Sequence, residues 1–272
     1  MNRAADPWMR PLAGLVLALM AVVVMASAWL RLAGAPRPDC DTWPLCRFDR
    51  PVAATIDPAA PPGVSGVRLA HRVAASAALV AIVVLLVGAW RSRDRAARRV
   101  TAGLLALALG LSLLGIATPG SRLSAVMLGN LLSGALMFAL AWVLWRGLDR
   151  AEPMPPRLRR GAALVALLWL AQAALGALSG AGAGAIATLL HLLLALLLPI
   201  AGFVLALALQ RAQRGSEAHS LLAVLALQIA LGVAGALSGA APALVVAHNA
   251  AAAVGLALLS GWAFAGERLP AA

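Results

Sequence analysis

Residues 185–209 read AIATLLHLLLALLLPIAGFVLALAL, a run with no charged side chain and a single histidine, His191. A helix needs about 20 mostly apolar residues to cross the hydrocarbon of a bilayer, so this run predicts a membrane-spanning helix. Seven further apolar runs are also long enough. They lie at residues 12–29, 69–90, 100–117, 123–145, 162–178, 221–237 and 243–264. The sequence therefore predicts an all-α integral membrane protein with eight transmembrane helices.

The composition supports this class, because a chain that is 62% hydrophobic and only 12% charged, with a mean hydropathy of +0.91, is too apolar for a soluble domain. The net charge of +12 would suggest nucleic acid in a soluble protein. Here every basic residue is an arginine, and the arginines cluster in alternate linkers, at 3–10, 91–99, 146–160 and 211–214. The positive-inside rule accounts for this pattern. We therefore expect a multi-pass protein of the plasma membrane with both termini cytoplasmic, and no nucleic-acid partner.

The helices divide into two sets of four. We expect an N-terminal half at 1–147, a cytoplasmic arginine-rich linker at 148–160 and a C-terminal half at 161–272. The two halves are predicted to be pseudo-repeated four-helix bundles.

The C-terminal half carries its own internal likeness. QAALG at 172–176 resembles QIALG at 228–232, and each is followed by a Leu-Ser-Gly before a short outer turn. The next apolar run then contains a histidine, His191 in one case and His248 in the other. Each lies about two helical turns from the outer end of its predicted helix, so the two imidazoles are expected at one depth.

Histidine within a membrane helix suggests function, because an imidazole without a partner is costly in hydrocarbon. Two neutral imidazoles from facing helices can supply both axial ligands of a haem iron, a familiar use of four-helix bundles. The alternative is that each histidine simply hydrogen-bonds a neighbouring helix. Equal depth favours the first interpretation, and we expect His191 and His248 to bind haem b through its iron.

The N-terminal half has one corresponding histidine, His71, on the run at 69–90. At the equivalent depth of the run at 123–145, Gly129 or Asn130 stands where a second histidine would complete the pair. His71 could bind iron alone, or it could hydrogen-bond a porphyrin propionate or another helix. Its neighbour Arg72 could pair with a propionate or snorkel toward the interface, as could Arg31. His219, beside Glu217, is expected to be a solvated surface residue.

The long outer loop holds the only two cysteines, Cys40 and Cys46, in the run CDTWPLC. Thiols outside the cytoplasm tend to be oxidised, so we expect a disulfide on the outer face. It could be a structural staple or a reducible bond with a redox or haem-handling role.

These features together resemble haem A synthase. The resemblance spans nearly the whole chain and depends on the eight apolar runs, the duplicated halves, the cysteine loop, the His71-Arg72 pair and the two later histidines. It is most specific where RLAG at 31–34 precedes the cysteines. The family oxidises a methyl group of haem O to a formyl group by successive hydroxylations, for terminal oxidase assembly.

The resemblance implies a haem b cofactor at His191 and His248 and a substrate porphyrin, haem O or a relative, near His71, under the Cys40–Cys46 loop. It also implies an electron donor and an enzyme that supplies haem O. Two family residues are absent here. Arg68 replaces a glutamate three residues before His71, and Gly129 or Asn130 replaces a histidine. The sequence thus leaves two functions open: a membrane oxidoreductase with an altered first site, or a noncatalytic haem b protein in electron transfer or haem handling. A permease is disfavoured, because the helices carry almost no charge for a transport path.

Overall fold

The computed structural model describes residues 7–32, 63–92, 94–117, 124–148, 153–180 and 184–265. Within these ranges every regular element is an α-helix, and all eight helices are long and apolar enough to cross a membrane. They are α1 (Met9–Leu32), α2 (Val64–Ser92), α3 (Arg95–Ala117), α4 (Ser124–Gly147), α5 (Pro156–Gly180), α6 (Ala185–Arg211), α7 (Gly215–Leu237) and α8 (Pro242–Ala263). The predicted class, all-helical with eight potential spans, is confirmed.

Several helices begin earlier than their apolar runs, because local chemistry, not hydropathy, sets the first turn. At the start of α3, the Asp94 carboxylate accepts hydrogen bonds from the backbone N–H groups of Ala96 (2.9 Å) and Ala97 (3.0 Å). These two donors have no partner inside the helix, so the carboxylate caps it. Helix α5 begins at Pro156, inside the predicted linker, and proline suits a first helical position because that residue needs no N–H.

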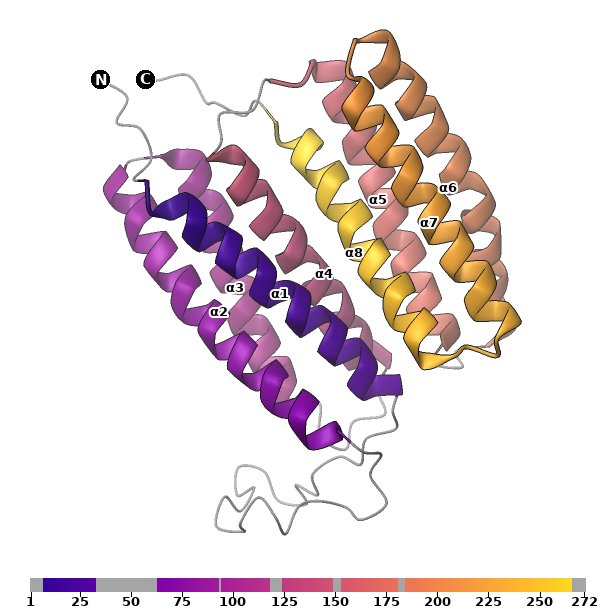
Figure 1. Ribbon diagram of the computed structural model, residues 1–272, viewed down its shortest axis with the longest axis horizontal. Coiled ribbons are helices and arrows are strands. Elements are labelled where there is room, and N and C mark those ends of the chain that lie inside the picture. The colour runs from indigo at the N-terminus through magenta and orange to yellow at the C-terminus, as the bar shows by residue number, and fades with distance from the viewer. Residues whose placement is uncertain are drawn as a thin grey trace.

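The eight helices form two groups of four (Figure 1). In the first group, α1 packs against α2 and α4, and α3 packs against the same two helices. The second group repeats this cycle, with α5 and α7 each packed against α6 and α8. The groups meet mainly through α4 and α8, with α1 also against α8. In each group, α2 and α4, or α6 and α8, are therefore diagonally opposed.

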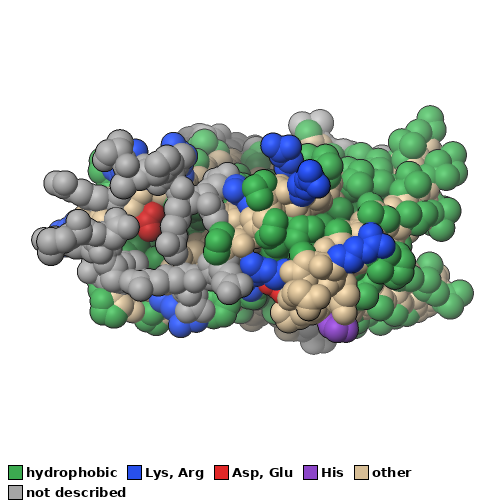
Figure 2. All heavy atoms as spheres, turned by 90° about the horizontal axis from the view of Figure 1, so that it is seen from above, with side chains coloured by type: hydrophobic (Ala, Val, Ile, Leu, Met, Phe, Trp, Pro, Cys, Tyr) green, Lys and Arg blue, Asp and Glu red, His purple; other side chains and the backbone are tan. Residues whose placement is uncertain are grey.

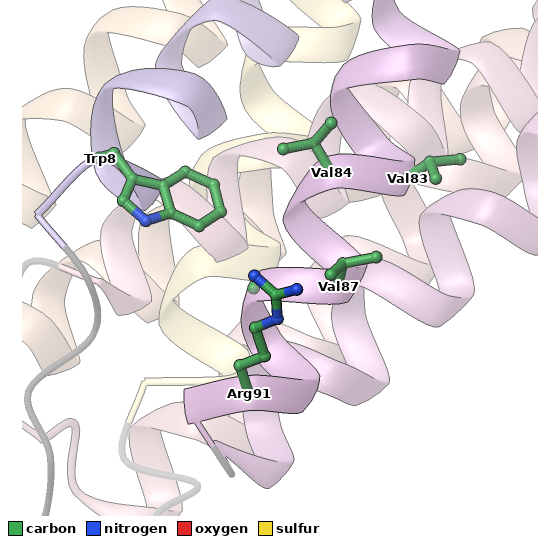
Figure 3. Close-up of a pocket in the computed structure, with 6 residues that line it drawn as sticks. Trp8, Val83, Val84, Val87 and Arg91 are labelled. Atoms are coloured by element: carbon green, nitrogen blue, oxygen red, sulfur yellow. The ribbon is translucent and has the colours of Figure 1, made fainter.

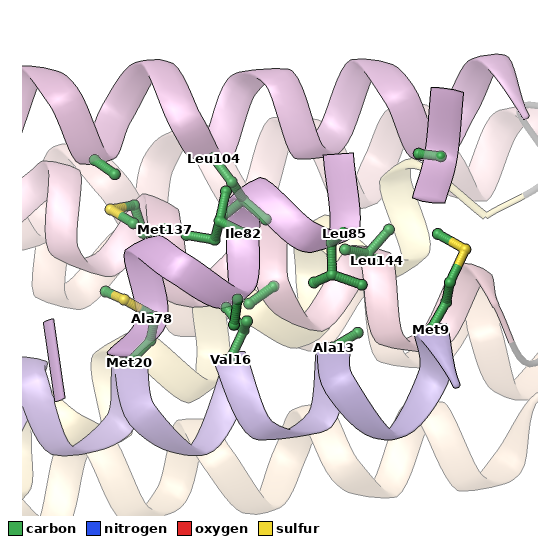
Figure 4. Packing of buried hydrophobic residues seen from close by; sticks show 14 of the residues in the cluster. Met9, Ala13, Val16, Met20, Ala78, Ile82, Leu85, Leu104, Met137 and Leu144 are labelled. Carbon is green, nitrogen blue, oxygen red and sulfur yellow. The ribbon is translucent and has the colours of Figure 1, made fainter. Parts of the chain in front are cut away.

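Each group has its own hydrophobic core. In the first, α1 presents Met9, Ala13, Val16 and Met20, at the three- and four-residue spacing of one helix face. Figure 4 shows this face against side chains from the other three helices. Those partners include Ala78, Ile82, Leu85, Leu104, Met137 and Leu144. The second core contains Trp169, Leu205, Leu221 and Leu259, and it also takes in Ala139 of α4.

The two ends of the molecule differ in chemistry. We call the end at which α1, α3, α5 and α7 begin the arginine end, and the opposite end the histidine end. Figure 2 looks onto the arginine end and shows arginine side chains gathered over the helix termini, with hydrophobic side chains on the flanks. The sides of the helices carry exposed apolar side chains, which is expected of a surface that faces lipid, because lipid tails cannot hydrogen-bond polar groups. Examples are Leu196, Phe203 and Leu237, which are 68%, 52% and 84% exposed.

Candidate functional site

The two histidines of the second group lie at one depth near the histidine end. His191 is six residues beyond the first residue of α6 (185 to 191), and His248 is six beyond the first residue of α8 (242 to 248). At 1.5 Å per residue, each is about 9 Å along its helix. Both side chains are partly buried. Since α6 and α8 are diagonally opposed, the imidazoles come from opposite corners of the bundle.

The His191 ring is seated on α5. Its Nδ1 lies 3.2 Å from the backbone carbonyl oxygen of Gln172, which can only accept, so Nδ1 carries the proton. Gly176, one turn further along α5, faces the ring edge: a Cβ on this glycine would lie 2.8 Å from Cε1. The imidazole therefore occupies space that any other residue at 176 would fill.

The His248 ring is seated on α7 in a matching way. Its Nε2 lies 3.1 Å from the side-chain amide nitrogen of Gln228, and a Cβ on Gly232 would lie 3.1 Å from its Cε1. The sequence likeness between 172–176 and 228–232 thus corresponds to one arrangement used twice. In each case an atom of the glutamine residue lies within hydrogen-bond distance of one ring nitrogen, and the glycine one turn later leaves room for the edge of the ring.

The other ring nitrogen of each histidine makes no hydrogen bond within the described residues. His248 Nδ1 is buried and has no hydrogen-bond partner in the described part of the chain, and His191 Nε2 makes none there either. The side-chain oxygens of Gln172 and Gln228 are also buried and unpartnered among these residues. Leaving a buried polar atom unsatisfied costs about 1–3 kcal/mol. This group of polar atoms is therefore suited to a bound ligand.

The buried residues of α5 and α8 end below the histidine layer, whereas α6 and α7 are still buried beyond it, at Ala187 and Gly235. On α5 the last buried residue is Trp169, and on α8 the first is Ala251. The Trp169 indole N–H donates to the backbone oxygen of Ala252 (2.8 Å), and its ring covers Gly255. Beyond this indole floor, the residues of α5 and α8 up to the histidine end are partly or fully exposed.

The first group has the same layout with different donors. His71 lies on α2 seven residues beyond its start (64 to 71), and Asn130 lies six beyond the start of α4 (124 to 130). The side chain of Leu114 covers Gly129, where a Cβ would lie 2.9 Å from its Cδ1. Asn130, not Gly129, is thus at the depth of the other two histidines. Arg68 is on α2 one turn before His71.

Within the described ranges, no three His, Cys, Asp or Glu side chains converge on one point. The donors available to a metal are therefore single histidines and the His191–His248 pair. Two imidazoles do not complete the four-ligand shell of a structural zinc ion, but they supply the two axial positions of a haem whose porphyrin provides the other four. The chemistry of the donor set fits haem.

The other sequence-predicted residues fall outside this site. His219 is exposed on the first turn of α7, and the neighbouring Glu217 forms a 3.1 Å ion pair with Arg214. Arg31 and Arg72 are exposed near the histidine end. Cys40 and Cys46, with the expected disulfide, lie outside the described residues.

A shallow groove at the opposite end of the first group is separate from the histidines. It is lined by Trp8, Val83, Val84, Val87, Gly88 and Arg91. In Figure 3 the guanidinium of Arg91 lies between the indole of Trp8 and Val87. An aromatic ring and a charged tip on an apolar wall are typical of a membrane interface.

Sequence reasoning noticed the glutamine–glycine repeat but assigned its residues no role, and it missed Trp169 as the floor. The available signal was the repeat itself, because a polar residue at a fixed distance before each histidine marks the helix face that meets the ring.

No protein-family model matches this chain, and no curated protein matches it at significant sequence similarity. The case for its function therefore depends on the arrangement of its own residues.

Proposed function

We propose that this protein is a membrane haem protein of the haem A synthase type. Its second half holds haem b between His191 and His248, and its first half receives haem O near His71. The observation that carries the proposal is the matched pair of imidazoles. They lie at one depth on opposed helices, each with one ring nitrogen held and the other without a partner in the described chain.

The second group fits a porphyrin on three counts. The His191 imidazole suits iron ligation, because its Nδ1–H donates to the Gln172 carbonyl oxygen and leaves Nε2 as an electron-pair donor. The helix faces beyond Trp169 are largely apolar, and the glycines at 176 and 232 allow the imidazole edges to pack closely against α5 and α7. Haem b, when bound there, supplies one-electron transfer.

In the first half, His71 would hold the substrate porphyrin, and Arg72 and Arg31 would face its propionates at the histidine end. The proposed activity is oxidation of the haem O methyl group to a formyl group. Water would supply the oxygen atom, four protons would be released, and four electrons would pass by way of haem b, held by His191 and His248, to a partner that accepts them. We place the arginine end in the cytoplasm by the positive-inside rule, so that both porphyrin sites and the cysteine loop belong to the outer side of the plasma membrane.

A second candidate function is a noncatalytic haem b protein in electron transfer or haem handling. It is favoured by the first group, where Arg68 stands one turn from His71 in place of a proton-accepting carboxylate. On the opposed helix, Asn130 lies at the ligand depth, and asparagine is a poor iron ligand.

The deciding experiment has two arms. The first measures haem b in the purified protein by its reduced-minus-oxidised spectrum, and absence of haem b would overturn both functions. The second extracts haems from haem O-producing cells with and without this protein and weighs them by mass spectrometry. Haem A or its hydroxylated precursor, appearing only with the protein, supports the oxidoreductase. Unchanged haem O beside co-purified haem b favours the noncatalytic protein.

A further inference from the structure

The groove at the arginine end combines an apolar wall with one guanidinium group. It lies where α1 begins and α2 ends, and its volume is about 200 Å³. Val84 and Val87 of its wall are 44% and 47% exposed, so the groove opens on the apolar side of the bundle. Val83 is eight residues before Arg91, or about 12 Å along the helix. A ligand that lies in the groove must therefore be apolar over most of this length.

Trp8 forms the opposite wall and is packed closely on α2. Its indole covers Gly88, where a Cβ would lie 2.5 Å from Cη2 and 2.8 Å from Cζ2. A glycine at 88 lets the ring come this close, because a side chain there would meet it. Indole rings concentrate at the level of the lipid headgroups. The groove thus begins at headgroup level and continues along α2 toward the hydrocarbon.

Arg91 is the charged residue of this lining. Its guanidinium makes no hydrogen bond, ion pair or ring contact within the part of the chain that the structure describes. Two other arginines at this end are engaged: Arg98 lies over Trp90, 5.6 Å from the ring centroid, and Arg10 lies over Trp145 at 5.5 Å. Figure 3 shows the Arg91 guanidinium at the groove, beside its apolar wall. Its N–H donors are therefore available to a ligand.

We propose that this groove binds one anionic phospholipid, with an acyl chain along the valines of α2 and the phosphate on Arg91. The fork of an arginine matches two phosphate oxygens, and basic pockets between membrane helices bind anionic headgroups. Charge complementarity selects this class of lipid, because Figure 2 shows arginine side chains gathered over the same end. The choline of a zwitterionic lipid would add a positive charge there. The proposal goes beyond the proposed function, since it needs neither a histidine nor haem.

The second group provides a matched control for Arg91. Arg211 is exposed in the last turn of α6, as Arg91 is in the last turn of α2. Helices α2 and α6 hold corresponding places in the two groups, so both arginines lie at the arginine end. Arg211 is not part of the groove lining. Replacing either arginine removes the same charge from the same end, and only one replacement changes the groove.

The test measures lipid binding to the whole chain in detergent by native mass spectrometry. Phosphatidylglycerol and phosphatidylcholine with identical acyl chains are added separately. The wild type should bind one phosphatidylglycerol in preference to phosphatidylcholine. Arg91→Gln should weaken phosphatidylglycerol binding about fivefold or more, and Arg211→Gln should behave like wild type. Equal weakening in both variants would overturn the proposal, because it would show a general attraction to the basic end.

A second pair of variants tests the seat of the acyl chain. Val84→Phe fills the groove and should lower phosphatidylglycerol binding several-fold. Val73→Phe should not change it, because Val73 is 59% exposed on the same helix but outside the lining. Circular dichroism shows whether each variant keeps its helices. Unchanged binding in a folded Val84→Phe, or a wild type that binds the two lipids equally, would overturn the proposal.

Discussion

The two four-helix groups share a scaffold and differ in what they place at one depth. In the second, a glutamine position, a glycine and a histidine are combined on each of two hairpins. In the first, His71 makes no hydrogen bond in the described part of the chain, and Leu114 packs onto Gly129 next to Asn130. One fold thus carries a complete pair of imidazoles and an incomplete one. Under the proposed function, holding a permanent haem and acting on a second porphyrin would place different demands on the same arrangement of helices.

The largest expected effect separates the two groups directly. His191→Ala or His248→Ala should abolish the low-spin b-type spectrum, because six-coordinate iron needs both imidazoles. His71→Ala should leave that spectrum in place, since His71 belongs to the other bundle. The optical spectrum of each purified variant measures this, and His219→Ala controls for loss of an exposed histidine. A full spectrum in either second-group variant, or its loss in His71→Ala, would break the comparison.

A second change should make the first group resemble the second. Asn130 lies six residues beyond the start of α4, the same distance along its helix as His191 and His248. Helix α4 is diagonally opposite α2, which carries His71. Asn130→His should complete a second pair of axial ligands and raise the haem-to-protein ratio above that of the wild type, up to about twofold if both sites fill. Quantified haem per purified protein measures the gain. Asn130→Gln, polar but without an imidazole, is the control, and an unchanged ratio in Asn130→His would count against the shared layout.

The third prediction concerns the glycines that seat the rings. Gly176→Ala and Gly232→Ala place a Cβ at 2.8 Å and 3.1 Å from an imidazole Cε1 and should displace the ligand, weakening haem retention several-fold. Gly180 and Gly235 lie on the same helices, and a Cβ at either would have nothing within 4 Å. Their alanine variants should retain haem normally, because alanine only improves helix propensity. Haem release after dilution in detergent distinguishes the pairs, and similar release from all four variants would contradict the seating role.

The sequence predicted some of these features well and others not at all, for a physical reason. A helix needs about 20 apolar residues to cross the hydrocarbon of a bilayer, so hydropathy alone located all eight helices. The depth of His191 and His248 followed from counting residues along them. The rotation of each helix about its axis did not follow, because α6 and α8 are apolar on every side and carry little facing signal. The contact between Gln228 and His248 therefore needed the structure.

The smallest expected effect tests the floor below the second site. Trp169→Phe keeps an aromatic ring over Gly255 but removes the 2.8 Å hydrogen bond to the Ala252 carbonyl. The free energy of unfolding should fall by about 1 kcal/mol, the usual net value of such a bond, and haem b should remain bound. Thermal unfolding in detergent, with Trp90→Phe at a 64% exposed position as control, measures the difference. Loss of haem without loss of stability would mean that Trp169 contacts the ligand itself, so the space for the porphyrin would extend deeper than the histidine layer.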